Sequence, residues 1–291
     1  MRSALLIGLT LSGCLIAQDR PGSSKDHPNG TPIEGWRDIA MNGDDLCALH
    51  LDGSLWCGTR RGLTRLGEES YRALGGLDYG GLCAVRASGT LVCGLHNAVG
   101  VAPFEIDGTF VDVTGTRDAG CGLREGGSVR CWPEATSVPG PFSAIGGGDR
   151  FACGITHPGD GLVCWSIDSL TFDEALVNVP SGSFEQVVTD RHVGCGLRFD
   201  GAIQCWGYDF DDVLPGPPAG SYSRVWLSGG RGCAVSDDGR ARCWGGDAGD
   251  PNYPELDPPP ELEFTTLAVG HGVGCGITQG AGVIECWGEP T

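Results

Sequence analysis

Lysine and methionine are nearly missing from this sequence. One Lys (Lys25) and two Met stand among 291 residues, whereas Gly occurs 51 times and Pro 18 times. This composition argues against long amphipathic helices and favours a turn-rich β protein. Positive charge is scarce as well, since 19 Lys and Arg face 37 Asp and Glu, for a formal net charge of −18. Phosphate backbones repel such a chain, so we expect no nucleic-acid partner.

The short motifs of common enzyme chemistries are also missing. The sequence has no G-x-S-x-G, no H-E-x-x-H, no P-loop and no dinucleotide fingerprint. Three consecutive glycines at 146–148 stand between predicted strands, without the helix that would make them a phosphate site. The six histidines lack metal-ligand spacing. We therefore expect no catalytic residues, no metal site and no enzyme activity.

The amino terminus predicts export and a lipid anchor. Arg2 precedes an apolar run, Ala4–Leu11, that is too short to span a bilayer but fits a signal peptide. The stretch 11–14 (LSGC) resembles the bacterial lipobox, in which cleavage before the cysteine leaves it to carry acyl chains. We predict a signal peptide over 1–13, then a lipidated Cys14 and a flexible tether up to residue 35. An ordinary secretory signal with a chance cysteine is the alternative.

Fifteen cysteines without any C-x-x-C motif indicate an oxidising compartment. Cys14 aside, they fall into seven pairs, ten or eleven residues apart. If the two members of a pair face each other across an antiparallel hairpin, a loop of three or four residues joins the strands. The Cα atoms then lie within disulfide reach. We predict seven disulfides within the hairpins: Cys47–Cys57, Cys83–Cys93, Cys121–Cys131, Cys153–Cys164, Cys195–Cys205, Cys233–Cys243 and Cys275–Cys286.

Each cysteine pair belongs to a repeat of about 38 residues. An aromatic residue stands eleven positions before the first cysteine, twelve in the second copy, and an aliphatic residue follows it three positions later. Units without helical periodicity indicate short strands, and seven such units close naturally into a propeller. We predict an all-β, seven-bladed β-propeller over 36–291, with one disulfide in each blade. Residues 29–35 are expected to add the strand that the last blade lacks and so to close the ring.

The repeat resembles the cysteine-bearing bacterial form of the RCC1 (regulator of chromosome condensation) repeat. It reads aromatic-x-x-aliphatic, Cys-[Ala/Gly]-[Leu/Val/Ile] and Gly-x-x-x-Cys-Trp-Gly, and the copy at 184–207 shows each part. The resemblance covers 36–288 and implies the seven-bladed propeller of that family. It does not imply the nucleotide-exchange activity of the family's founder, because this chain is acidic, carries an export signal and lacks a Gly-Gln-Leu-Gly stretch.

The connections between units vary in length, whereas the spacing within units does not. Three long connections, 165–183, 206–221 and 244–263, contain twelve acids and no Lys or Arg; we call them the acidic rim. Loops outside a repeated core often carry binding function, so we predict that the rim binds a partner. Solvating charge is the alternative. The candidate binding residues are Tyr208, Asp209, Phe210, Asp211, Asp212, Asp247, Asp250 and Tyr253.

These features predict an exported binding or scaffold protein, anchored in the bacterial cell envelope through the acyl chains of Cys14. Leu15 rather than Asp follows this cysteine, which favours the outer membrane in a Gram-negative host. The expected partner is a basic envelope or extracellular protein, or a glycan. We expect no cofactor; Ca²⁺ is the alternative, without a D-x-[DN]-x-[DN]-G loop to support it. The competing function is a polysaccharide lyase or glycosidase with carboxylates on one propeller face.

Overall fold

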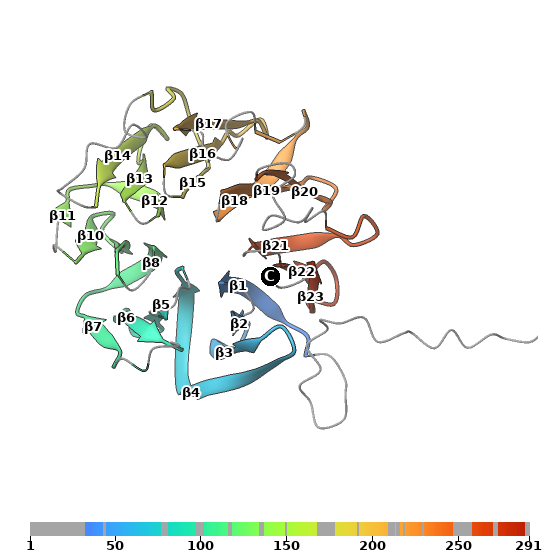
Figure 1. Cartoon of the computed structure of the whole chain (residues 1–291). Coiled ribbons are helices and arrows are strands. Elements are labelled where there is room, and N and C mark those ends of the chain that lie inside the picture. Colours follow the sequence, from blue (N-terminus) through green and yellow to red (C-terminus); the bar gives the residue numbers. More distant parts are fainter. Residues whose placement is uncertain are drawn as a thin grey trace, which may run out of the picture.

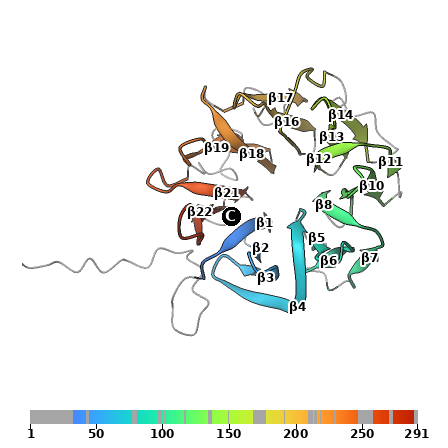
Figure 2. The ribbon, with the colours of Figure 1, turned by 180° about the vertical axis from the view of Figure 1, so that it is seen from behind.

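The computed structural model describes most of the chain after residue 32. The described residues are 33–42, 45–76, 81–96, 100, 102–115, 118–133, 137–148, 150–167, 178–190, 192–208, 213, 216, 217, 219–228, 230–246, 258–269 and 273–288. Every helix or strand assigned in these residues is a β-strand. The strands form antiparallel sheets arranged around a common centre (Figure 1), and the ring is equally clear from behind (Figure 2). The signal peptide, Cys14 and the tether up to residue 32 lie outside the described residues.

Seven units follow one another around the centre, each with three antiparallel strands. Units one to seven begin at Trp36, Tyr71, Phe110, Phe142, Phe184, Tyr222 and Phe264. The inner strands are β1 (Trp36–Asn42), the second half of β4 (Gly62–Leu74), β8 (Phe110–Gly115), β12 (Phe142–Gly147), β15 (Gln186–Thr189), β18 (Tyr222–Ser228) and β21 (Phe264–Val269). The middle strands are β2 (Asp45–His50), β5 (Leu82–Arg86), β9 (Gly120–Arg124), β13 (Phe151–Thr156), β16 (Val193–Leu197), β19 (Arg231–Ser236) and β22 (Val273–Thr278). The third strands are β3 (Ser54–Thr59), β6 (Leu91–Leu95), β10 (Val129–Trp132), β14 (Leu162–Ser166), β17 (Ile203–Gly207), β20 (Ala241–Gly245) and β23 (Ile284–Gly288).

A fourth strand distinguishes the first three units from the rest of the described chain. The first half of β4 pairs with β3, which joins units one and two into one seven-stranded sheet. β7 (Phe104–Ile106) pairs with β6, and β11 (Ser137–Val138) pairs with β10. In the described residues of units four to seven, each sheet contains three strands, and the third strand is the outermost.

The cysteines of each pair face each other across the hairpin of the middle and third strands. The structure contains the seven disulfides that the spacing predicts, with Cα–Cα distances of 3.9 to 4.1 Å. The turn glycine of the three-residue loop is in the left-handed region, with a φ of 86° at Gly53 and 80° at Gly201. The turns therefore have the conformation for which glycine was expected.

Close packing explains why the repeats are rich in glycine. In unit five, a Cβ on Gly194 would lie 2.4 Å from the Trp206 ring, and one on Gly196 would lie 2.5 Å from Phe184. Both rings are buried, with 4% of Trp206 and none of Phe184 exposed. The aromatic residue that opens the unit and the Trp after its second cysteine thus each require a small residue opposite them.

One backbone hydrogen bond connects consecutive units and recurs throughout the ring. The N–H of the opening aromatic residue donates to the carbonyl of the preceding hairpin turn, as from Phe110 to Gly89 at 2.9 Å and from Tyr222 to Gly201 at 3.0 Å. The N–H of Trp36 makes the same bond to Gly282 of unit seven at 3.1 Å. Side chains of units one and seven also share one apolar cluster, which includes Trp36 and Ile277.

Residues 33–35 are the described part of the segment that was expected to close the ring. They form no strand, although Ile33 packs against the cluster that units one and seven share. Residues 29–32 lie outside the described residues. The additional strand on the last unit therefore stays a prediction.

Candidate binding surfaces

The acidic rim begins at the third strands of three consecutive units, where β14, β17 and β20 end (Figure 1). Of the eight candidate binding residues, Tyr208 is the one that the structure describes. Its side chain is exposed, and its backbone N–H donates to the carbonyl of His192 at 3.0 Å. Glu261 and Glu263, two further acids of the rim, are also exposed. Asp209, Phe210, Asp211, Asp212, Asp247, Asp250 and Tyr253 lie outside the described residues.

The inner strands carry a second set of polar residues, which the sequence did not single out. Arg37 and Arg72, each directly after an opening aromatic residue, donate from their guanidinium groups to the carbonyls of Tyr71 and Phe110 on the next inner strand. The Gln186 side chain donates to the Val225 carbonyl at 2.8 Å and accepts from the Val225 N–H at 3.0 Å. These side chains connect neighbouring units at the centre of the ring.

Two carboxyl groups in this set face unusual surroundings. Burial raises the pKa of Asp38 to about 6, against a hydrogen bond from the Ile39 N–H. The nearby charge of Asp112 raises this pKa further, whereas Arg224 and Arg37 lower it. Burial likewise raises the pKa of Asp112. Because β1, β8 and β18 belong to units that are not neighbours, the charges of Asp112 and Arg224 act on Asp38 across the centre.

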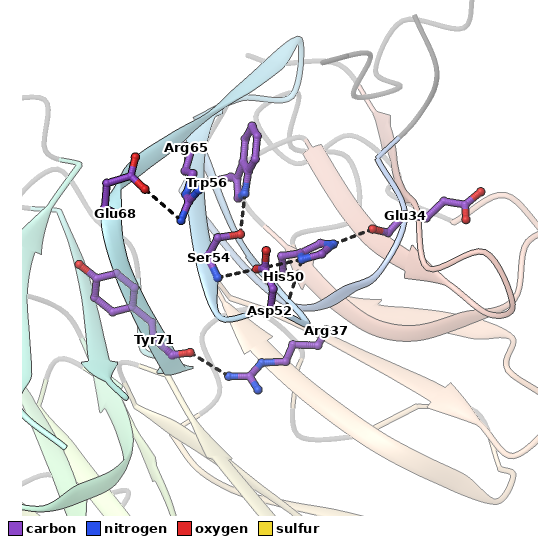
Figure 3. A network of polar contacts seen from close by, with 9 residues as sticks. All are labelled: Glu34, Arg37, His50, Asp52, Ser54, Trp56, Arg65, Glu68 and Tyr71. Carbon is purple, nitrogen blue, oxygen red and sulfur yellow. Dashed lines mark hydrogen bonds and ion pairs between the residues drawn. The ribbon is translucent and has the colours of Figure 1, made fainter. Parts of the chain in front are cut away.

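A polar network fixes the point at which the tether meets unit one (Figure 3). The Nε2 atom of His50 lies 2.9 Å from the Glu34 carbonyl, and its Nδ1 atom lies 2.9 Å from a carboxylate oxygen of Asp52. This carboxylate accepts from the Ser54 N–H at 2.8 Å. Hydrogen bonds from Ser54 and His50 hold the pKa of Asp52 well below its usual range. The network holds Glu34 against the first hairpin turn, beside the Trp36–Gly282 bond.

Two arginines of unit one, Arg60 and Arg65, make side-chain contacts within the protein. Arg60 is 7% exposed, and its guanidinium donates to the Gly288 carbonyl of unit seven at 3.0 Å. Arg65 forms an ion pair with Glu68 at 3.5 Å (Figure 3). The connection at 58–70 thus contains three arginines and two glutamates, whereas the acidic rim contains no Lys or Arg.

The described residues contain no group of three or more His, Cys, Asp or Glu that could hold a metal ion. Among the same residues, no helix is long and apolar enough to cross a membrane. The described geometry contains a polar centre, a hydrogen-bonded entry point of the tether and exposed rim positions.

Comparison with solved structures decides the fold. The CRINKLY WD40 ectodomain of the Arabidopsis thaliana receptor kinase ACR4 matches with a TM-score of 0.69 and 20% identity, over 89% of this chain and 96% of that chain. Yeast RCC1 (Prp20), in a structure bound to Kap60, matches with a TM-score of 0.61 and 13% identity, over 86% and 79%. The chain has an RCC1-like β-propeller fold.

A third match agrees with this assignment. The entire ectodomain of the Physcomitrella patens receptor kinase CR4 has a TM-score of 0.66 and 22% identity, over 88% of this chain and 74% of that chain. No protein-family model matches the sequence, and no curated protein matches it. At these identities the matches establish the fold alone, and the predicted RCC1-like fold is confirmed.

Proposed function

We propose that this protein is a lipid-anchored, extracytoplasmic binding protein of the bacterial cysteine-rich RCC1-like type, built on a closed propeller of seven blades. The observation that carries the proposal is a contrast within the chain. One frame of strands and disulfides repeats seven times, whereas acids gather in three connections of consecutive units. A rigid frame that presents variable loops is a common basis of binding sites.

Three contacts support ring closure. The Trp36–Gly282 hydrogen bond joins units seven and one, and the equivalent bond joins each of the six remaining pairs of consecutive units. Arg60 reaches the Gly288 carbonyl, and Trp56 and Cys286 pack against the same apolar cluster. These contacts between the first and last units support the proposed closed ring.

Seven disulfides support export to an oxidising compartment. The lipobox-like stretch 11–14 supports an anchor at Cys14, with outer-membrane sorting in a Gram-negative host. Cys14→Ser should release the protein from the membrane fraction and abolish palmitate labelling. Membrane retention of the variant, with no label on the wild type, would contradict the anchor.

The rim supplies the binding chemistry. With twelve acids and no cation, it attracts a basic protein segment over long range, and its aromatic residues can anchor the contact. If the partner is a glycan, its binding would depend on the aromatic side chains of the rim rather than on the acids. Calcium is the remaining ligand class, because carboxylate oxygens are its preferred ligands.

Two variants of equal charge test the rim. The rim variant changes Asp209, Asp211, Asp212, Asp247 and Asp250 to Asn. The control variant neutralises five exposed acids outside the rim: Glu34, Asp107, Asp118, Glu125 and Glu185. Binding to immobilised polylysine should fall roughly tenfold for the rim variant, mainly through a slower on-rate, and should change little for the control. Equal loss in both variants would contradict the proposal.

A further inference from the structure

The seven disulfides differ in how well their outer cysteine is covered. The inner cysteine of each bridge, on the middle strand, is at most 1% exposed in all seven units. The outer cysteine, on the third strand, is 2%, 0% and 1% exposed in units one to three, at Cys57, Cys93 and Cys131. It is half-buried in units four to seven, at Cys164, Cys205, Cys243 and Cys286.

The fourth strand accounts for this difference. In unit two, Phe104 of β7 lies directly opposite Cys93 in the sheet, and both belong to one apolar cluster. In units one and three, Leu66 of β4 and Val138 of β11 belong to the clusters of the outer cysteines. In the described residues of units four to seven, the strand with the outer cysteine is the outermost strand of its sheet.

The tryptophan of the neighbouring unit does not explain the difference, because both groups have it. Trp132 shares a cluster with Cys93, and Trp206 packs with Cys164 in the same way. The indole N–H of Trp165 donates to the Sγ atom of Cys131 at 3.3 Å. Cover from the side of the next unit is therefore common to both groups, whereas cover by a fourth strand occurs, among the described residues, in units one to three.

We propose that the disulfides of units four to seven are sites of thiol–disulfide exchange with a dithiol reductant, attacked at the outer sulfur, and that those of units one to three are closed to it. One thiolate of the reductant bonds to the outer Sγ, the S–S bond breaks, and the inner cysteine leaves as a thiolate that takes up a proton. The second thiolate of the reductant then attacks the mixed disulfide. This attack is on the reductant's own sulfur. The outer cysteine leaves as a thiolate that takes up a proton, and the reductant closes into its own disulfide, so that two electrons pass to the bridge.

Reduction of these bridges would also affect the acidic rim. This consequence rests on the proposed function, whereas the exchange itself does not. The rim segments 165–183, 206–221 and 244–263 begin directly after Cys164, Cys205 and Cys243. Reduction removes the covalent link at the start of each segment while the hairpin hydrogen bonds remain. A reducing partner would therefore loosen the three connections proposed for binding and leave units one to three unchanged.

Native reduction followed by peptide mapping tests the proposal. The folded full-length protein is treated with dithiothreitol, quenched at intervals with iodoacetamide, and then fully reduced and labelled with N-ethylmaleimide. The bridges of units four to seven should open roughly tenfold faster, or more, than those of units one to three. In guanidinium chloride all seven should open at similar rates. Equal native rates, or faster opening in units one to three, would overturn the proposal.

A pair of variants at one position tests the cover. Phe104→Ala removes the side chain opposite Cys93 and should speed opening of the Cys83–Cys93 bridge roughly tenfold. Phe104→Leu keeps an apolar cover and should leave that rate close to the wild-type value. Cys195–Cys205 is the internal reference in both variants, because a general loss of folding would speed its opening too. An unchanged Cys83–Cys93 rate in a folded Phe104→Ala protein would overturn the role of the fourth strand.

Discussion

Units one to three and units four to seven share one frame but differ at the outer edge. In both groups a disulfide joins the middle and third strands, and the opening aromatic residue bonds to the preceding turn. The first group adds a fourth strand, which buries the outer cysteine. The second group contains the three connections that form the acidic rim. The comparison teaches that all units share the frame, whereas the proposed binding and exchange sites belong to the units whose described residues have no fourth strand.

Trp36 lies where units seven and one meet, and its loss should have the largest effect. It is 4% exposed and belongs to the cluster that units one and seven share. Trp36→Ala should lower the free energy of unfolding by about 3–5 kcal/mol, because the frame on both sides loses a buried ring. Guanidinium unfolding measures this. Phe199→Ala, at a turn residue that is 62% exposed, is the control and should change it by less than about 0.5 kcal/mol.

Removing one disulfide from each group tests whether the frame is equivalent in both. The double variants Cys83→Ala/Cys93→Ala and Cys195→Ala/Cys205→Ala each open a bridge with a sequence separation of 10. Each should lose about 2–3 kcal/mol, because the bridge restricts the unfolded chain equally in both. Thermal unfolding compares them. If only the Cys83→Ala/Cys93→Ala variant loses stability, the outer edge of the unit, rather than the shared frame, determines how much a disulfide stabilises the protein.

The raised pKa of Asp38, an inner-strand residue of unit one, predicts that the free energy of unfolding depends on pH. Its pKa of about 6 in the folded protein is above the ordinary aspartate value of 3.8, so between these values the folded state binds the additional proton. Stability from this group therefore falls as the pH rises from about 4 to about 6 and stays reduced above. Asp38→Asn should raise the free energy of unfolding by about 1–2 kcal/mol at about pH 7.5 and should have little effect at about pH 4.

Substitution of Asp52 should change stability in the opposite direction, so Asp52 is the matched control for Asp38. Its pKa is lowered in the folded state by hydrogen bonds from Ser54 and His50, so ionisation of this carboxyl favours folding. Asp52→Asn should lower the melting temperature at neutral pH and should have little effect in strong acid. If both substitutions shift stability in the same direction at neutral pH, the account of the polar centre is wrong.

The smallest effect on stability should come from the rim. The five-residue rim variant should unfold within about 0.5 kcal/mol of the wild type, because exposed charges away from partners contribute little. Relief of their mutual repulsion can even raise the melting temperature slightly. A loss of several degrees would show that the rim supports the frame, which would remove the distinction between the two.

The sequence predicted those parts of the fold that are local. A separation of ten residues with a glycine before the second cysteine determines both the hairpin and the pairing, so Cys195 and Cys205 could be matched without a structure. The approach of Asp38, Asp112 and Arg224 could not be predicted, because it joins units that are distant in sequence. The different exposure of the outer cysteines could not be predicted from the sequence either, because it depends on short strand pairings such as that of β11 with β10. All eight candidate binding residues of the rim, Tyr208 included, remain predictions.

Amide hydrogen exchange at the opening aromatic residues tests the central claim most directly, namely that seven equivalent units form one closed ring. The relevant amides are those of Trp36, Tyr71, Phe110, Phe142, Phe184, Tyr222 and Phe264, which donate the bonds between units. A closed ring predicts that the Trp36 amide exchanges within about tenfold of the other six. Exchange at Trp36 that is about a thousandfold faster than at the others would contradict closure.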